Sequence, residues 1–143
     1  MTITVHVVTY PSERDTAFDI RRRVFQEEQG VPAEEEFDAD DARATHVLAH
    51  VDETPVGTGR IVIRGGDAKV GRMAVRREWR RRGVGRAIMQ ELTRVAHEHD
   101  VRRLVLHAQV QAIPFYEGLG FHSVGETFEE AGIPHRRMER DLW

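Results

Sequence analysis

"RRRGVGRAI" (residues 80–88) decides the fold prediction, because a strand pattern ends just before it and a helix pattern begins within it. Upstream, "KVGRMAV" (69–75) is typical of a strand. Downstream, apolar residues recur about four apart from Val84 to Ala96, which predicts an amphipathic helix of about fifteen residues. A helix N-terminus exposes unpaired N–H groups, and glycines let several of them converge on one anion. The stretch therefore predicts a phosphate-binding turn.

Two better-known phosphate-binding loops do not fit this stretch. The Walker loop needs Gly-Lys-Ser or Gly-Lys-Thr after its glycines, and no such triplet occurs. The dinucleotide fingerprint needs a small residue three positions after the second glycine, where this chain has Ile88. On these residues alone, a glycine-rich turn with solvated arginines is an equally good interpretation.

Upstream of residue 69 the sequence alternates strand and helix patterns. Residues 3–7 predict a strand, Ser12 is suited to cap a helix, and helical spacing from Ala17 to Phe25 predicts that helix, which ends at Gly30 and Pro32. Residues 45–51 and 56–63 flank "DETP" and predict a hairpin. Together with residues 69–75 they predict an antiparallel meander.

Downstream, "RLVLHA" (103–108) is a nearly continuous apolar run, which predicts a buried strand parallel to residues 69–75. A short helix is expected within residues 112–120, and closing strands at 121–128 and 136–143. The predicted fold class is α/β, of the α+β kind, with a mixed, mostly antiparallel sheet flanked by helices. At 143 residues the chain is expected to form one domain, residues 1–143.

Composition excludes several classes of protein. The net charge of −3 and the lack of aromatic residues among the arginines argue against a nucleic-acid binder. Without cysteine there is no thiolate nucleophile and no disulfide, and a cytoplasmic location is expected. No apolar run is long enough for a membrane span. No metal is expected either, because His97 and His99 are two apart on a helix and point in different directions.

The phosphate turn and a second stretch, "LHAQVQAIPFYEGLGF" (106–121), resemble two signatures of the GCN5-related N-acetyltransferase (GNAT) superfamily. The predicted order of elements is also similar to that of the superfamily. Residues 21–41, 45–51 and 129–141 further resemble its small ElaA-like branch. The resemblance implies the GNAT acyl-CoA N-acyltransferase fold, with acetyl-CoA in a V-shaped opening between the fourth and fifth strands. It also implies transfer of the acetyl group to an amine by direct attack in a ternary complex, and allows a homodimer.

The resemblance assigns cofactor contacts to three parts of the chain. The backbone of the strand before the turn pairs with the pantetheine arm, the N–H groups of the turn hold the pyrophosphate, and Gln109 replaces an asparagine that contacts the cofactor in many members. The cofactor-binding residues implied in this way are Met73, Ala74, Val75, Arg80, Arg81, Arg82, Gly83, Val84, Gly85, Arg86, Gln109, Ala112 and Phe115.

Tyr116 matches the tyrosine that, in many members, protonates the departing CoA thiolate; an aromatic core residue beside Phe115 is the alternative. The amine must also lose a proton, so the reaction needs a base. Many members place a glutamate in the strand before the turn, but residues 68–75 contain no carboxylate. Glu28 and His46 are the predicted catalytic replacements, and Glu36 and His135 are further candidates.

Eight acidic residues and no basic residue lie between Glu27 and Asp41, in a segment that borders the acceptor entrance in the GNAT fold. This favours a cationic acceptor, either a small-molecule amine or a peptide. The missing glutamate favours a rival hypothesis, a non-catalytic module that binds or senses acyl-CoA. Release of CoA thiol in the presence of amines distinguishes the two.

Overall fold

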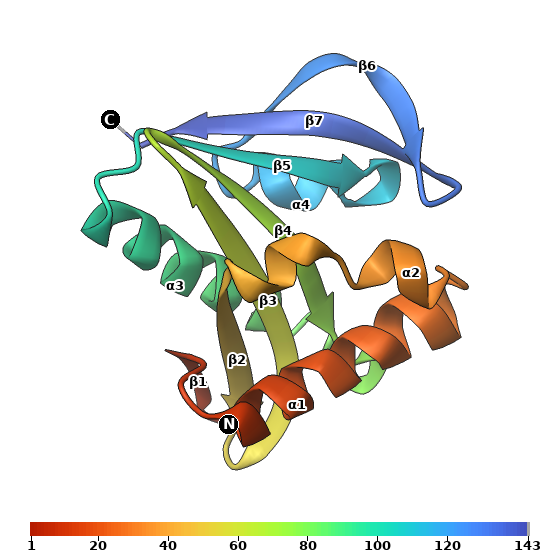
Figure 1. Ribbon diagram of the computed structural model, residues 1–143, viewed down its shortest axis with the longest axis vertical. Helices are drawn as coiled ribbons and strands as arrows, with labels where there is room; N and C mark the ends of the chain where they lie inside the picture. Colours follow the sequence, from red (N-terminus) through yellow and green to blue (C-terminus); the bar gives the residue numbers. More distant parts are fainter. Residues whose placement is uncertain (143) are drawn as a thin grey trace.

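The computed structural model describes residues 1–142; the predicted closing strand reaches Trp143, which lies outside the described residues. In this described part of the chain, seven strands form one sheet in the order β1-β2-β3-β4-β5-β7-β6 (Figure 1). They are β1 (Ile3–Val7), β2 (Thr45–Val51), β3 (Thr54–Arg64), β4 (Asp67–Val75), β5 (Arg103–Gln109), β6 (His122–Glu130) and β7 (Ile133–Asp141). Within the described residues, β4 and β5 pair in parallel and every other neighbouring pair is antiparallel. The predicted mixed, mostly antiparallel sheet is confirmed.

Helices cover both faces of the sheet (Figure 1). On one face, α1 (Pro11–Arg21) continues as a π-helix, η1 (Arg22–Glu28), followed by α2 (Ala33–Glu36) and a 3-10 turn, η2 (Ala39–Ala42). On the other face lies α3 (Val84–Glu98), preceded by η3 (Arg77–Trp79). After β5 come η4 (Val110–Ala112) and α4 (Ile113–Glu117). None of the helices in residues 1–142 is long and apolar enough to cross a membrane.

Each face of the sheet has its own apolar core. Ala17, Ile20 and Val24 of the first helical layer pack with Leu48 and Ala74 of the sheet. The larger core lies under α3, whose buried residues are Val84, Ile88, Met89, Leu92, Val95 and Ala96. These α3 positions recur at the helical spacing that the sequence predicted, and the helix spans the predicted range.

The first helix begins one residue earlier than the predicted cap. Pro11 opens α1 and Tyr10 is its N-cap residue, so the assignment of Ser12 as the cap is wrong. Proline suits the first helical position, because its φ is preset and no N–H is needed there. Glu13 Oε1 accepts hydrogen bonds from the N–H groups of Thr9 (3.0 Å) and Tyr10 (3.1 Å), which holds the entry to the helix.

The parallel pair β4 and β5 separates soon after it forms. Pairing covers only Asp67–Lys69 of β4 against Arg103–Val105 of β5 within the described residues. On its other side β4 carries a β-bulge, because its register with β3 shifts between Thr58 and Arg60, and Arg72 lies in the left-handed region with φ +50°. A bulge bends its strand and increases the local twist. The V-shaped opening predicted between the fourth and fifth strands is therefore present.

Candidate functional site

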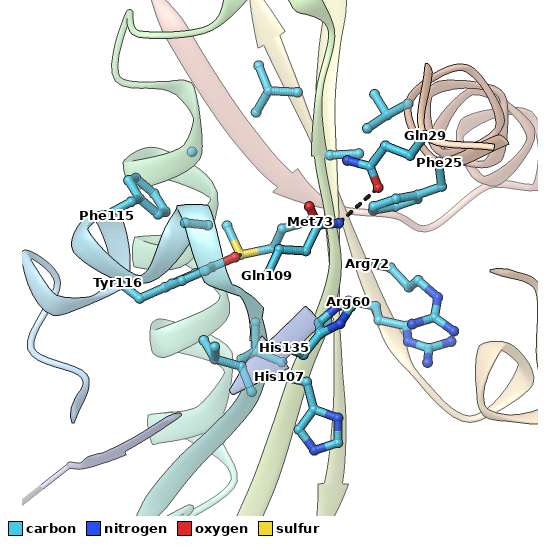
Figure 2. A pocket seen from close by; sticks show the side chains of 18 of the residues that line it. Phe25, Gln29, Arg60, Arg72, Met73, His107, Gln109, Phe115, Tyr116 and His135 are labelled. Atoms are coloured by element: carbon cyan, nitrogen blue, oxygen red, sulfur yellow. Dashed lines mark hydrogen bonds between the residues drawn. The ribbon is translucent and has the colours of Figure 1, made fainter. Parts of the chain in front are cut away.

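A cavity of about 830 Å³ occupies the opening between β4 and β5 (Figure 2). Its walls come from β4, the β4–α3 turn, the start of α3, β5, α4 and the β6–β7 hairpin, with η1 and α2 along one side. Most small-molecule sites have volumes of roughly 300–1,000 Å³. The cavity therefore has the size of a ligand site, and it adjoins the predicted phosphate turn.

At one end of the cavity, the start of α3 offers backbone donors. Gly83 is the N-cap residue with φ +89°, a left-handed conformation that favours glycine. The N–H groups of Val84, Gly85 and Arg86 follow it and have no acceptor within the helix. Gly85 also leaves room for a neighbouring ring, because a Cβ there would lie 3.1 Å from Cζ of Phe115. Converging N–H groups at a helix N-terminus fit a phosphate group.

The four arginines of this stretch have different roles. Arg81 and Arg86 line the cavity, and within residues 1–142 neither forms an ion pair. Arg80 also lines it, but its Nε donates to the Val75 carbonyl oxygen (2.8 Å) and its guanidinium pairs with Glu28 (2.9 Å). Arg82 lies outside the lining, with its guanidinium 5.2 Å from the centre of the Trp79 ring. The structure therefore brings three of the four arginines to the cavity and leaves two of them free for an anion.

The β4 wall presents backbone groups and Tyr116 faces it. Within residues 1–142, the edge of β4 that faces β5 has no strand partner beyond Lys69, and this edge includes the predicted contacts Met73, Ala74 and Val75. The Tyr116 hydroxyl approaches the Met73 sulfur at 3.8 Å (Figure 2), and its ring packs against Phe115 with centroids 5.0 Å apart. Burial raises the pKa of Tyr116 to about 12, so this hydroxyl keeps its proton at neutral pH. A protonated phenol in this position is suited to donate to an anion.

Gln109 and Ala112 line the cavity where β5 ends. The Gln109 Nε2 donates to Oε1 of Gln29 at 2.8 Å (Figure 2). Its Oε1 accepts from Nε2 of Gln111 at 2.6 Å. The first of these hydrogen bonds joins β5 to the residue that follows η1. The Gln109 amide therefore reaches the opposite side of the cavity.

The two predicted bases do not lie in the cavity lining. Glu28 is at the end of η1 and is paired with Arg80. His46 is buried, with Nε2 2.9 Å from the Asp41 carbonyl oxygen, and burial lowers its pKa. Glu36 is only 2% exposed and pairs with Arg21 at 2.6 Å. Of the four carboxylate and imidazole candidates, His135 alone combines a place in the lining with freedom from an ion pair among the described residues.

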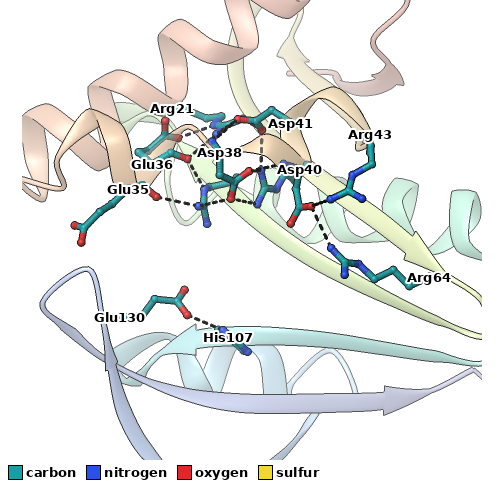
Figure 3. Close-up of polar contacts among 12 residues, drawn as sticks. Arg21, Glu35, Glu36, Asp38, Asp40, Asp41, Arg43, Arg64, His107 and Glu130 are labelled. Atoms are coloured by element: carbon teal, nitrogen blue, oxygen red, sulfur yellow. Dashed lines mark hydrogen bonds and ion pairs between the residues drawn. The ribbon is translucent and has the colours of Figure 1, made fainter.

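A histidine that the sequence did not single out lies on the β5 wall. The Nδ1 atom of His107 is 2.8 Å from Oε2 of Glu130 at the end of β6, and both residues line the cavity (Figure 3). The hydrogen bond from His107 outweighs partial burial and lowers the pKa of Glu130 to about 2. The available signal was a polar residue inside the apolar run "RLVLHA", but its carboxylate partner is 23 residues away.

Carboxylates of the acidic segment (residues 27–41) form ion pairs with arginines of other elements, among them α1, β3 and β4 (Figure 3). Asp41 lies between Arg21 and Arg60, at 2.7 Å from each guanidinium. Arg60 also binds Asp38 at 2.7 Å, and Arg72 donates to backbone carbonyl oxygens of α2. Among the described residues, five of the segment's eight carboxylates therefore form ion pairs with arginines, so the charge that it presents is smaller than its composition suggests. The cationic acceptor stays a prediction.

The sequence profile of the acetyltransferase (GNAT) domain matches residues 11–142. The chain belongs to the GNAT acetyltransferase family. The match covers the phosphate turn, both walls of the cavity and Tyr116. The predicted GNAT fold and family are confirmed together.

Individual GNAT relatives resemble the chain over most of its length. The uncharacterized N-acetyltransferase YjcF of Bacillus subtilis is 40% identical over 126 residues, covering 87% of this chain and 90% of that protein. ElaA of Escherichia coli is 32% identical over 129 residues, covering 86% and 84%. The crystal structure of ElaA superposes with a TM-score of 0.85 at 26% identity, over 97% of this chain and 99% of that one. The predicted ElaA-like resemblance is confirmed.

A more distant GNAT structure shares the fold. The PaiA N-acetyltransferase from Thermoplasma acidophilum, solved in complex with coenzyme A, superposes with a TM-score of 0.76 at 16% identity. The alignment covers 99% of this chain and all of PaiA.

Proposed function

We propose that this GNAT protein transfers an acetyl group from acetyl-CoA to the amine of a small molecule or peptide. One observation carries the proposal: a single cavity joins a helix N-terminus, whose first N–H groups have no acceptor within the helix, to the Tyr116 hydroxyl. The first feature suits a pyrophosphate and the second suits a thiolate leaving group. The coenzyme A bound to PaiA supports the same ligand class in this fold.

The lining residues divide the cavity into a phosphate end and a reaction end. At the phosphate end, the N–H groups of Val84 to Arg86 hold pyrophosphate oxygens, and Arg81 and Arg86 add charge-assisted hydrogen bonds. Along β4, the edge from Met73 to Val75, which has no strand partner on the β5 side within residues 1–142, pairs with the amides of the pantetheine arm, as an added strand does. This placement carries the thioester toward Tyr116, which lies against Met73.

At the reaction end, the amine nitrogen attacks the thioester carbonyl directly while both substrates are bound. Tyr116 donates its hydroxyl proton to the sulfur as the carbon–sulfur bond breaks. The chain contains no cysteine to carry the acetyl group, so a ternary complex is the simpler route.

The rival proposal is a module that binds acyl-CoA without catalysis, and the absence of any carboxylate from residues 68–75 of β4 favours it. It predicts tight binding of CoA with no release of thiol.

Thiol release from acetyl-CoA across a panel of amines and peptides tests the proposed reaction. We expect turnover with at least one acceptor, and a fall in kcat of about 100-fold in Tyr116→Phe, the size of effect typical of a lost proton donor. Tyr10→Phe is the matched control, because Tyr10 is exposed at the start of α1, outside the cavity. Equal kcat in Tyr116→Phe and the wild type would remove the acid role. CoA binding without thiol release for any acceptor would establish the rival.

A further inference from the structure

We propose that His107 is the general base that accepts the proton of the amine, and that Glu130 positions its ring. The proposal rests on the proposed acetyl transfer and supplies the residue that this reaction lacks on β4. It begins from the hydrogen bond between His107 Nδ1 and Glu130 Oε2, which joins two strands at the cavity wall (Figure 3).

The hydrogen-bond partner of Nδ1 determines whether Nε2 of His107 carries a hydrogen or a free lone pair. A carboxylate accepts hydrogen bonds but has no hydrogen to donate, and the pKa of Glu130, lowered to about 2, keeps it a carboxylate. The hydrogen of a neutral His107 must therefore be on Nδ1, which leaves the lone pair on Nε2. A carboxylate also stabilises the imidazolium that forms when Nε2 takes a proton. The pair has the chemistry of an oriented base.

Aromatic contacts hold the His107 ring in place. Its ring meets Phe128 edge to face, with centroids 5.0 Å apart and planes at 80°. Phe128 in turn stacks on His135, at 6.1 Å and 23°. The Nδ1 of His135 lies 2.6 Å from the carbonyl oxygen of Ile133, so this ring is bound to its own backbone rather than to a carboxylate. Two histidines thus line the cavity, and the carboxylate partner distinguishes His107 as the base.

The position of His107 along β5 places it inside the opening. Val105 is the last β5 residue paired with β4, and His107 lies two residues further on, where the strands have separated. Because side chains alternate along a strand, the side chains of Val105 and His107 point to the same face of the sheet. The structure thus brings a base to the β5 wall of the cavity, opposite the β4 wall where many GNAT members carry a glutamate.

Other charged groups near the pair come from β4 and β7. Lys69 of β4 lines the cavity and lowers the pKa of Glu130 further. Arg137 of β7 lies directly across from His107 in the sheet, and its Nε donates to Glu139 at 2.8 Å. Across the opening, Arg60 and Arg72 are bound to Asp38. Glu130 is therefore the carboxylate that directly faces His107 among the described residues.

The proposed step balances for an amine that reaches the site uncharged. The nitrogen forms a bond to the thioester carbonyl carbon, and the carbon–sulfur bond breaks. One amine proton passes to Nε2 of His107, while the sulfur receives the proton of the Tyr116 hydroxyl. Transfer of the proton from His107 to Tyr116 through solvent restores both residues, and the products are the amide and CoA thiol.

Chemical rescue tests the role of His107. We expect His107→Ala to lower kcat by at least about 100-fold, within the range of general base catalysis, while the Kd for CoA changes less than about twofold. Added imidazole should raise the kcat of His107→Ala at least about tenfold, because it can occupy the space left by the ring and accept the proton there. The matched control is His122→Ala, whose histidine lies on β6 outside the cavity lining and whose kcat should not change.

Variants of Glu130 test the positioning role. Glu130→Gln keeps an oxygen that can accept the Nδ1 hydrogen, so it should retain more kcat than Glu130→Ala, with the same KM for acetyl-CoA in both. Equal kcat in the two variants would overturn the positioning role.

The outcomes separate this proposal from the proposed function. Turnover by the wild type with undiminished kcat in His107→Ala, or rescue by imidazole of His135→Ala but not of His107→Ala, overturns the base assignment and leaves acetyl transfer standing. Absence of turnover by the wild type with every acceptor overturns the proposed function, and the role of His107 with it.

Discussion

Replacement of Arg21 by methionine should be among the most destabilising single changes in this chain. Arg21 is 1% exposed and lies at the end of α1. Its Nε donates to Glu36 at 2.6 Å, and its two terminal nitrogens donate to Asp41 at 2.7 and 3.1 Å. The guanidinium thus ties α1 to the acidic segment beside the cavity.

The expected loss of stability in Arg21→Met depends on which groups remain buried without a partner. Methionine keeps an unbranched apolar side chain between the rings of Phe18 and Phe37, each now 4.8 Å from the guanidinium, so the cavity left by the change is small. Asp41 keeps its second partner, Arg60, at 2.7 Å. Glu36 loses its cation while remaining buried. Removing one partner of a buried pair costs about 3–5 kcal/mol, and the surviving Arg60 contact favours the lower half, about 3–4 kcal/mol, of a total stability of about 5–15 kcal/mol.

Equilibrium urea unfolding at neutral pH measures this loss. Arg22→Met is the matched control, because Arg22 pairs with Asp19 at 2.7 Å where both side chains are exposed, and such pairs contribute about 1 kcal/mol or less. Adding Glu36→Gln to Arg21→Met removes the stranded carboxylate, so the double variant should regain about 1 kcal/mol or more. A loss in Arg21→Met no larger than in Arg22→Met would refute the reasoning, as would strictly additive losses in the double variant.

Three further predictions concern the phosphate end of the cavity and the acidic segment. Gly85→Ala should raise the Kd for CoA about tenfold, since the new Cβ would meet Phe115 at 3.1 Å, while Gly66→Ala, at an open position, should not; calorimetric titration measures both. Arg86→Gln should raise the Kd for CoA about fivefold and reduce its salt dependence, measured from 50 to 300 mM salt; an unchanged salt slope would contradict the steering role. Although burial opposes it, Arg21 and Arg60 hold the pKa of Asp41 at about 2, so about 2 kcal/mol of stability present above pH 4 should be lost as the pH falls toward 2. Asp41→Asn should flatten this part of the stability profile in urea unfolding.

The elements of the fold were predictable because each one carries its own periodic signal. The α3 helix shows its apolar stripe, and the strands before and after it show alternating or continuous apolar runs. The close packing of α3 against β3 was harder to predict. In the sequence, Gly57 and Gly59 look like ordinary strand residues. In the structure, however, a Cβ at either position would lie 2.9 Å from the side chain of Ile88. Close approach of α3 to β3 depends on these glycines, and no local pattern states which helix will cover them.

Without the family resemblance, which supplied lining residues such as Gln109 and Tyr116, the candidate site was predictable from the residues only where the backbone forms it. Gly83 and the start of α3 were found because a left-handed residue and free N–H groups belong to one continuous stretch. The His107–Glu130 pair depends instead on the β5–β7–β6 order of strands, which brings together residues 23 apart in sequence. The ion pairs of the acidic segment were missed for the same reason, since the arginine partners of Asp38 and Asp41 come from α1, β3 and β4. A count of charges along the chain cannot show which arginines the folded sheet brings next to which carboxylates.

The prediction for Glu28 shows how a local change of helix type redirects side chains. In an α-helix, residues Val24 and Glu28 would lie on one face, because they are four apart. Residues 22–28 instead form a π-helix, whose backbone hydrogen bonds join residues five apart and whose turn is therefore wider than that of an α-helix. At the end of this wider turn Gln29 lines the cavity together with Val24, whereas Glu28 lies outside the lining and pairs with Arg80. The same turn connects both walls of the cavity, through Glu28 to the β4–α3 turn and through Gln29 to Gln109 on β5. A ligand that binds Arg80 must displace Glu28 of η1, and a ligand that binds Gln109 must displace Gln29, which follows η1. Ligand binding at either wall is therefore linked to the position of this helix.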